Sequence, residues 1–189
     1  MISELKLNRL AEVQKKLSER IVERGLRPEE TETVGAVDVS YREGKARAAF
    51  VLCSFPDCAP LREKVVETEV PVPYMSTFFF LKETRPLLLV LKGEKFDVLL
   101  VEGHGRAHPR GYGLASHIGL LLGSPTIGVA KRPLRGSPKG SYRRVGKAYV
   151  SVGHLVDLES AVNIVGAVLE GGYPKPLRLA DRLSKRRWL

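Results

Sequence analysis

Residues 96–110, FDVLLVEGHGRAHPR, join an apolar run directly to a carboxylate, two glycines and two histidines. An uninterrupted Val/Leu run of this length is typical of a strand buried on both faces of a sheet. Binding sites in open α/β sheets form just beyond the carboxyl ends of such strands. The sequence therefore predicts a strand at 97–101 and a functional site that begins at Glu102.

The segments on either side of this strand predict an α/β fold. Strands are expected at 34–41 and 46–53, joined as a hairpin, and at 64–70 and 126–130, with a basic loop and hairpin over roughly 131–153. Helices are expected at 2–24, 78–89, 111–122 and 160–169, and the chain ends in a basic helix or tail. Hairpin strands followed by β-α-β units imply a mixed β-sheet flanked by helices.

Apolar residues at helical spacing predict the face that two of these helices bury. The helix at 2–24 is expected to cover the sheet through Ile2, Leu5, Leu10, Val13, Leu17 and Ile21. The helix at 111–122 is expected to point Leu114, Ile118, Leu121 and Leu122 inward. Pro86 would cap or break the helix at 78–89, and the prolines within 71–74 make that segment a loop.

Length and composition narrow the class of protein. The 189 residues, 43% apolar and 28% charged, suit a single domain spanning 1–189, and a monomer is expected. No apolar run approaches the roughly 20 residues of a membrane span, and the N-terminus has no secretory pattern, so a cytoplasmic protein without membrane contact is expected. Cys53 and Cys58 are expected to be reduced thiols, with a disulfide as the alternative.

The charge balance predicts the class of partner. The formal net charge is +10, and basic residues are concentrated at 106–110, 131–147 and 185–187. A solvated surface is the ordinary explanation of a basic run. An excess of this size in a small domain favours a polyphosphate partner, so we expect contact with nucleic acid.

Three carboxylates from separate predicted elements are candidates for a metal site. Asp38 lies within a buried strand, where an unpaired charge is costly, and Gly35 leaves room for close approach. Glu102 ends its strand, and Glu83 lies in a helix. If the three meet, their oxygens suit Mg²⁺ or Mn²⁺, and two such ions can clamp the attacking and leaving oxygens of a phosphodiester. The structural alternatives are a hydrogen-bonded Asp38, a capping Glu102 and a surface Glu83.

Residues near these carboxylates could handle protons, phosphates or bases. His104 and His108 could orient water or move a proton near neutral pH, whereas His117 is expected to be structural. Lys131, at the end of its strand, could neutralise a phosphate. Tyr74, beside two prolines, could insert into a base stack. A surface lysine and an aromatic packed in its loop are the alternatives.

Several short blocks of the chain form a recognisable set. They are 37–41 (VDVSY), Pro73-Tyr74 with Glu83, 103–110 (GHGRAHPR) with 113–117 (GLASH), 127–131 (IGVAK) and 178–181 (RLAD). Together they resemble the endonuclease V family of deoxyinosine-directed endonucleases, occur in that family's order and cover about residues 34–182. The resemblance implies a ribonuclease H-like fold and a Mg²⁺-dependent DNA repair nuclease, with Mn²⁺ as an alternative ion. Such an enzyme nicks DNA at the second phosphodiester bond 3′ to a deaminated base and leaves 3′-hydroxyl and 5′-phosphate ends.

The resemblance also implies roles for individual residues. The implied catalytic set consists of the metal-binding carboxylates Asp38, Glu83 and Glu102, supported at the scissile phosphate by His108 and Lys131. The implied substrate-binding residues are the wedge Tyr74 and the pocket and motif residues Phe79, Gly103, His104, Gly105 and Gly113. Asp181 would be an auxiliary carboxylate.

Two positions depart from the family pattern. Glu102 stands where the family has Asp, and one extra methylene moves the carboxylate by about 1 Å or more in a site that tolerates roughly 0.5 Å. After Tyr74 the chain reads Met75-Ser76-Thr77 instead of Ile-Pro-Gly, so a close backbone approach at Thr77 is lost. Two other functions stay open: a homologue that binds deaminated or branched nucleic acid without cutting it, and an endoribonuclease that acts on inosine in RNA.

Overall fold

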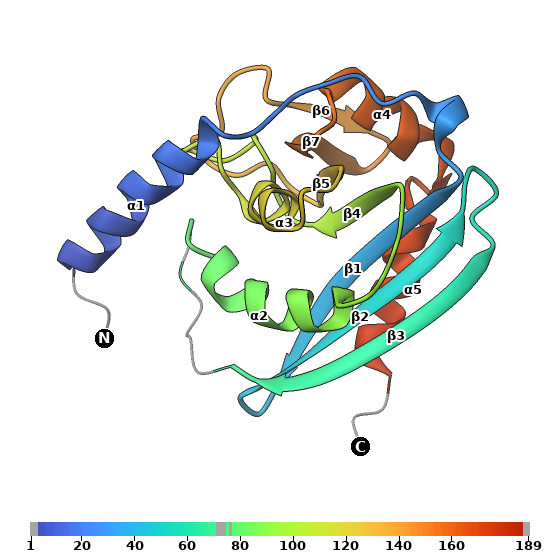
Figure 1. Cartoon of the computed structure of the whole chain (residues 1–189), viewed down its shortest axis with the longest axis horizontal. Helices are drawn as coiled ribbons and strands as arrows, with labels where there is room; N and C mark the ends of the chain where they lie inside the picture. The colour runs from blue at the N-terminus through green and yellow to red at the C-terminus, as the bar shows by residue number, and fades with distance from the viewer. Residues whose placement is uncertain (1–3, 71–74, 76, 187–189) are drawn as a thin grey trace.

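The computed structural model describes residues 4–70, 75 and 77–186. Its main feature is a seven-stranded mixed sheet with the strand order β3-β2-β1-β4-β5-β7-β6 (Figure 1). The central strands β1, β4 and β5 run parallel, and the remaining pairs are antiparallel. The strands are β1 Thr33–Arg42, β2 Lys45–Ser54, β3 Pro60–Glu69, β4 Val98–Glu102, β5 Thr126–Ala130, β6 Tyr142–Val145 and β7 Ala148–His154.

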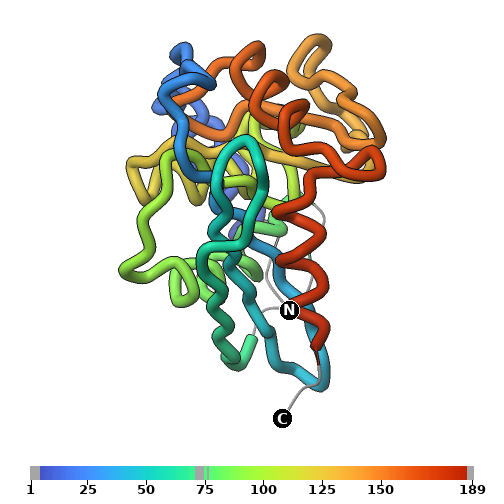
Figure 2. Tube along the Cα trace, turned by 90° about the vertical axis from the view of Figure 1, so that its right-hand side faces the viewer, coloured from blue at the N-terminus to red at the C-terminus, as the bar shows by residue number. Residues whose placement is uncertain are grey.

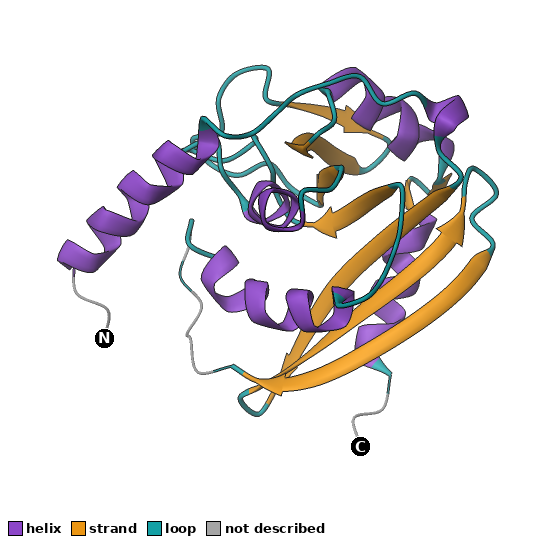
Figure 3. Cartoon of the chain, in the orientation of Figure 1, coloured by secondary structure: helices purple, strands orange, loops and turns teal. Residues whose placement is uncertain are grey.

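Helices pack on both faces of this sheet, as Figures 2 and 3 show. They are α1 Glu4–Ser18, α2 Phe80–Leu91, α3 Leu114–Leu122, α4 Leu158–Ala167 and α5 Lys175–Lys185, with a short 3-10 turn at Pro28–Glu30 and a small sheet of β8 Leu169–Glu170 and β9 Tyr173–Pro174. The buried side chains of α2 and α3 join one core cluster, and those of α4 and α5 join the other. The predicted mixed sheet flanked by helices is confirmed.

Side-chain alternation along the strands separates the two core clusters. On β1, Val34 and Ala36 join the cluster beneath α4 and α5, whereas Val37 joins the cluster beneath α2 and α3. On β4, residues 98–101 have no exposed surface. The strand predicted to be buried on both faces is therefore confirmed.

The N-terminal helix differs from its prediction. α1 ends at Ser18 rather than near residue 24, and it stands beside the sheet instead of covering it (Figure 1). Leu5 and Val13, expected to face inward, are 64% and 49% exposed, whereas Gln14 has no exposed surface. The helix packs against the loop after β4, so the predicted Leu10 and Leu17 stay on its more buried face while Leu5 and Val13 turn outward. Ile2 lies outside the described residues. The more buried face of α1 consists of Leu7, Leu10, Ala11, Gln14 and Leu17.

Other elements shift by a few residues. α2 continues through the buried Pro86, so the expectation that this proline caps or breaks the helix is wrong. α3 begins at Leu114 rather than at 111; Leu114 and Ile118 are buried as expected, but Leu121 in the last turn is 52% exposed, so its inward prediction is wrong. The basic C-terminal segment forms the helix α5. The predicted loop at 71–74 lies outside the described residues.

The state of the two cysteines and the character of the helices bear on two of the expectations. Cys53 and Cys58 are both buried free thiols, and burial raises the pKa of Cys53 to about 11. Within the described ranges, no helix has the length and apolar character needed to cross a membrane.

The parallel pairing of β1 with β4 brings two candidate residues to one edge of the sheet. Val37 pairs with Val101, so Asp38 and Glu102 follow at adjacent positions. Glu102 also pairs with Val129 near the end of β5. The carboxyl ends of parallel strands are where α/β sheets form binding sites.

Candidate active site

Asp38, Glu83 and Glu102 line one cavity of about 130 Å³. Asp38 lies on β1 and Glu102 ends β4, so the sheet fixes both backbones. Glu83 comes from the first turn of α2, which packs on this sheet, and is 4% exposed. Phe79 and Leu114 add apolar walls. The structure therefore brings the three carboxylates around one small cavity.

Each of the three carboxylates accepts a hydrogen bond from a hydroxyl group. The donor and acceptor pairs are Ser184 with Asp38 (2.7 Å), Tyr173 with Glu102 (2.6 Å) and Tyr41 with Glu83. Across the described part of the chain, no three His, Cys, Asp or Glu side chains form a group that could hold a metal ion as they stand. The metal-ligand roles therefore stay a prediction.

Burial raises the pKa of all three carboxyl groups. The pKa of Glu83 rises to about 8, because burial disfavours the charged form and the Asp38 charge repels it. Burial raises the pKa of Asp38, to which the charge of Asp181 adds, and it also raises the pKa of Glu102. A divalent cation in the cavity would offset this cost, and carboxylate oxygens are ligands that hard divalent cations prefer. The donor chemistry therefore fits such an ion.

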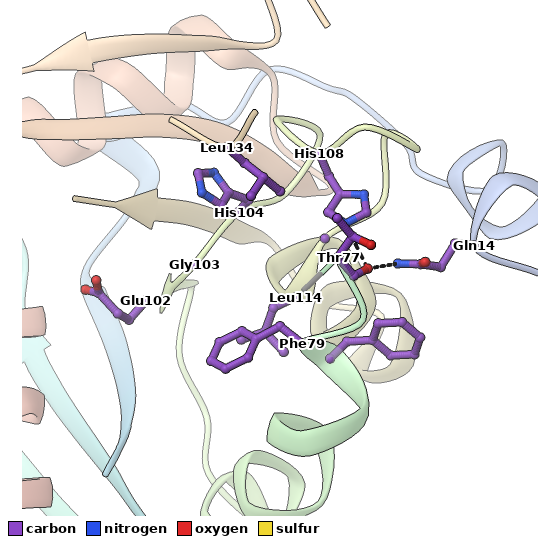
Figure 4. Close-up of a pocket in the computed structure, with 11 residues that line it drawn as sticks. Gln14, Thr77, Phe79, Glu102, Gly103, His104, His108, Leu114 and Leu134 are labelled. Carbon is purple, nitrogen blue, oxygen red and sulfur yellow. Dashed lines mark hydrogen bonds between the residues drawn. The ribbon is translucent and has the colours of Figure 1, made fainter. Parts of the chain in front are cut away.

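A larger cavity, of about 330 Å³ (Figure 4), shares Glu102, Phe79 and Leu114 with the acidic one. Leu114 and Leu134 add apolar surface to its lining. His104 also lines it, and its buried Nδ1 atom has no hydrogen-bond partner among the described residues. A mainly apolar cavity of this size with a few polar groups is typical of a site for a small molecule or a single base.

The three predicted glycines meet different constraints. Gly103 lines the larger cavity and has a φ of +147°, which L side chains rarely adopt. A Cβ atom at Gly113 would lie 2.3 Å from the carbonyl oxygen of His104, and one at Gly105 would lie 1.9 Å from that of Val152. Gly113 also lines the cavity, but Gly105 is not among its described lining residues. Gly105 is required here by the packing of backbone against backbone.

His108 and Lys131 occupy different environments. His108 is 4% exposed, and its Nε2 atom lies 3.0 Å from the carbonyl oxygen of Thr77. Burial and the charge of Arg110 lower the pKa of His108 to about 4, so its ring is neutral near pH 7. Lys131 is mostly exposed, with its Nζ atom 3.7 Å from Glu102 Oε1. Lys131 can therefore reach an incoming anion beside the acidic cavity.

Asp181 and Tyr74 complete the predicted set. Asp181 lies on α5, forms an ion pair with Lys185 at 2.5 Å, and lines a third cavity of about 400 Å³ together with Glu102 and Lys131. It stands near the main site without lining the acidic cavity. Tyr74 lies outside the described residues.

Sequence reasoning missed the residues that hold the predicted groups in place. Tyr41 belongs to the block 37–41, and Ser184 follows the block 178–181, so both lay within reach of the family resemblance. Tyr173 and Gln14 carried no such signal. A glutamine on a polar helix is ordinary until its buried partners are known.

The family model for endonuclease V matches residues 15–148 and 140–182. The chain belongs to the endonuclease V family. Endonuclease V of Thermococcus kodakarensis is 67% identical over 184 residues, which cover 97% of this chain and 93% of that protein.

Solved structures of this family share the fold. The catalytic domain of human endonuclease V has a TM-score of 0.86 at 28% identity, covering 97% of this chain and 96% of that one. Endonuclease V of Ciona intestinalis, in complex with a 23mer DNA containing an inosine followed by a ribo-adenosine, has a TM-score of 0.86 at 24% identity, covering 98% of each chain; at that identity the likeness shows the fold alone. The chain is therefore a metal-dependent nuclease with a ribonuclease H-like fold.

Proposed function

We propose that this enzyme nicks DNA at the second phosphodiester bond 3′ to a deaminated base, chiefly hypoxanthine, and so starts repair. The observation that carries the proposal is that Glu102 and Phe79 line both cavities. A base held in the larger cavity would belong to the same strand as a phosphate placed beside the carboxylates, so one substrate could occupy both cavities. The inosine-containing DNA bound to the Ciona intestinalis relative supports the same class of substrate.

In this proposal Asp38, Glu83 and Glu102 hold Mg²⁺, and Mn²⁺ can replace it. A bound divalent cation would stabilise charge on the phosphate and lower the pKa of a water molecule. Lys131 would neutralise phosphate charge from its exposed position, and the Nε2–H group of His108 would donate to a phosphate oxygen.

The same proposal assigns the larger cavity to the flipped base. Phe79 and Leu114 would pack on the base, and the backbone at Gly103 would approach it closely, because no side chain intervenes. Tyr74 would fill the space that the base leaves in the stack. Flipping costs a few kcal/mol and costs least at a mispaired or damaged base, which favours deaminated sites.

A nicking assay tests the function. The substrate is a duplex oligonucleotide with one hypoxanthine, incubated with and without Mg²⁺. We expect a nick at the second phosphodiester bond 3′ to the lesion, and only when the ion is present. Asp38→Ala should abolish cleavage and retain DNA binding, whereas Asp57→Ala, which removes an exposed carboxylate elsewhere, should cut normally. Undiminished nicking by Asp38→Ala would contradict the assignment.

The same assay separates the alternatives. Tight, salt-sensitive binding without a nick at any Mg²⁺ or Mn²⁺ concentration would identify a non-cleaving homologue. Glu102 and the altered sequence after Tyr74 are the features that support this alternative. Faster cutting of a matched inosine RNA than of inosine DNA would identify an endoribonuclease. We also propose that the protein is cytoplasmic and monomeric. Light scattering on the purified protein would test the monomer by measuring its mass.

A further inference from the structure

The carbonyl oxygen of Thr77 is the meeting point of three side chains. It lies 2.6 Å from Arg110 Nη2, 3.0 Å from His108 Nε2 and 3.3 Å from Gln14 Nε2. Dashed lines in Figure 4 join Gln14 and His108 to Thr77. Thr77 has a φ of +63°, which is uncommon for a β-branched residue. Three donors therefore hold Thr77 in a backbone conformation that β-branched residues rarely adopt.

Gln14 is the fixed member of this group. It has no exposed surface, although it belongs to a helix that is otherwise mostly exposed. Its Nε2 atom also donates to the carbonyl oxygen of Tyr112 over 3.0 Å, and its Oε1 atom accepts from Arg110 Nε over 2.7 Å. The amide thus uses both hydrogens and its oxygen in buried contacts. A fully satisfied buried network of this kind fixes side-chain positions.

The hydrogen bonds of His108 define its tautomer. The backbone N–H of Arg110 donates to His108 Nδ1 over 3.2 Å, so Nδ1 carries a lone pair. The ring is neutral, and its proton is therefore on Nε2 and donates to the Thr77 carbonyl oxygen. His108 faces Thr77 with the same N–H group that the proposed function assigns to the phosphate.

The number of donors exceeds what the carbonyl oxygen needs. A carbonyl oxygen has two lone pairs, and three donors point at this one. If His108 turns to a phosphate, Arg110 and Gln14 still satisfy the oxygen. If Gln14 is lost, the departure of His108 leaves a single donor. Leaving a partly buried acceptor poorly satisfied costs free energy, so His108 would then be retained at Thr77.

We propose that Gln14 and Arg110 form a clasp on the Thr77 carbonyl that frees His108 to engage the scissile phosphate, which makes Gln14 a positioning residue for the nicking reaction. The inference rests on the proposed function. Through Gln14, the N-terminal helix contributes to chemistry that it does not touch. Thr77 follows Tyr74 by three residues, so the clasp also anchors the chain beside the predicted wedge.

Gln14→Glu isolates the donor function. The carboxylate keeps an acceptor for Arg110 but removes both N–H groups, and Asn8→Asp makes the same chemical change at an exposed position of α1. With an oligonucleotide containing one inosine, we expect Gln14→Glu to lower the single-turnover rate about tenfold. Its DNA affinity should fall less than its rate, because Gln14 lines the larger cavity but uses its amide for Thr77, Tyr112 and Arg110. Asn8→Asp should match wild type in both.

A spectroscopic measurement reports on the clasp without catalysis. The chain has four histidines, so selective ¹⁵N labelling resolves their rings by NMR, with Asn substitution of each used for assignment. In wild type, the His108 signal should be that of the Nε2–H tautomer. Gln14→Glu should shift it, whereas Asn8→Asp should leave it in place.

The outcomes separate the two proposals. An unchanged rate and an unmoved His108 signal in Gln14→Glu would overturn the clasp, as would parallel losses of rate, affinity and thermal stability, which indicate a purely structural role. Wild-type protein that fails to nick inosine DNA would overturn the proposed function, while the NMR comparison would still test the clasp. If Gln14→Glu does not fold, Arg110→Lys replaces it, with the same expected loss of rate and shift of the His108 signal.

Discussion

The phenol of Tyr173 donates a hydrogen bond to Glu102 Oε2 across 2.6 Å and so links β9 to the end of β4. The other carboxylate oxygen of Glu102 lies 3.7 Å from Lys131 Nζ. Glu102 is the position at which the chain departs from the family's Asp. Each carboxylate oxygen of the longer Glu102 side chain therefore has a defined partner. This supports a functional carboxylate at position 102 rather than a non-functional replacement.

Removing the hydrogen bond from Tyr173 to Glu102 should slow the nicking reaction. Hydrogen bonds to charged groups contribute about 1.5–3 kcal/mol, so Tyr173→Phe should lower the single-turnover nicking rate at least about tenfold. Glu102→Asp should also be slower, because the shorter side chain withdraws from both partners. Tyr149→Phe, a phenol on β7 that packs on Tyr142, is the control. A faster Glu102→Asp enzyme would instead identify Glu102 as a suboptimal ligand.

Gly105→Ala should destabilise the fold more than other glycine substitutions. The new Cβ atom would lie 1.9 Å from the carbonyl oxygen of Val152, which belongs to β7 and cannot move without disturbing the sheet. Gly93→Ala is the comparison, because Gly93 has a φ of +80° but open space around it, and a positive φ costs about 1–2 kcal/mol. Thermal unfolding should show a much lower Tm for Gly105→Ala; equal Tm values would refute the packing role.

His117 should make the fold sensitive to acid. Burial lowers the pKa of His117 to about 4 from its ordinary 6.5, so unfolding takes up a proton between these values. Because the unfolded state binds more protons in that window, the contribution of His117 to the free energy of unfolding should fall as the pH falls from about 6.5 to 4. Glu83, whose pKa is raised to about 8, contributes with the opposite sign, so the His117 contribution is measured as a difference between wild type and variant.

His117→Gln provides the test of this acid sensitivity. It should remove up to about 3 kcal/mol of the difference in unfolding free energy between pH 7 and pH 4, measured by urea denaturation. His108, whose pKa is also lowered to about 4, should leave a residual slope. A His117→Gln variant with the full wild-type pH dependence would show that His117 is charged in the folded protein.

Local patterns in the sequence predicted most of the sheet. The apolar run before Glu102 and the hairpin pattern at 34–53 identified strands because burial on one or two faces leaves a regular trace in the chain. Asp38 and Glu102 could be proposed because the first interrupts and the second ends such a pattern, whereas the family resemblance supplied the role of Glu83. These signals depend on neighbours within a few residues.

Contacts between distant segments left no comparable trace. Tyr173 lies 71 residues from Glu102, and Ser184 lies 146 residues from Asp38. The burial of Gln14 was missed for the same reason. Apolar spacing placed Leu5 and Val13 on the inward face together with Leu10 and Leu17, and it gave no reason to place a glutamine there. The partners that bury a glutamine are carbonyl and guanidinium groups, which only the folded loop after β4 supplies.

The shared cation site is the central claim, and a crystal structure grown with Mn²⁺ tests it most directly, because anomalous scattering locates the ion. We expect an Mn²⁺ peak bound by carboxylate oxygens of Asp38, Glu83 and Glu102 in the cavity that they line. A peak at other residues, with these three side chains still bound only to their hydroxyl partners, would contradict the account.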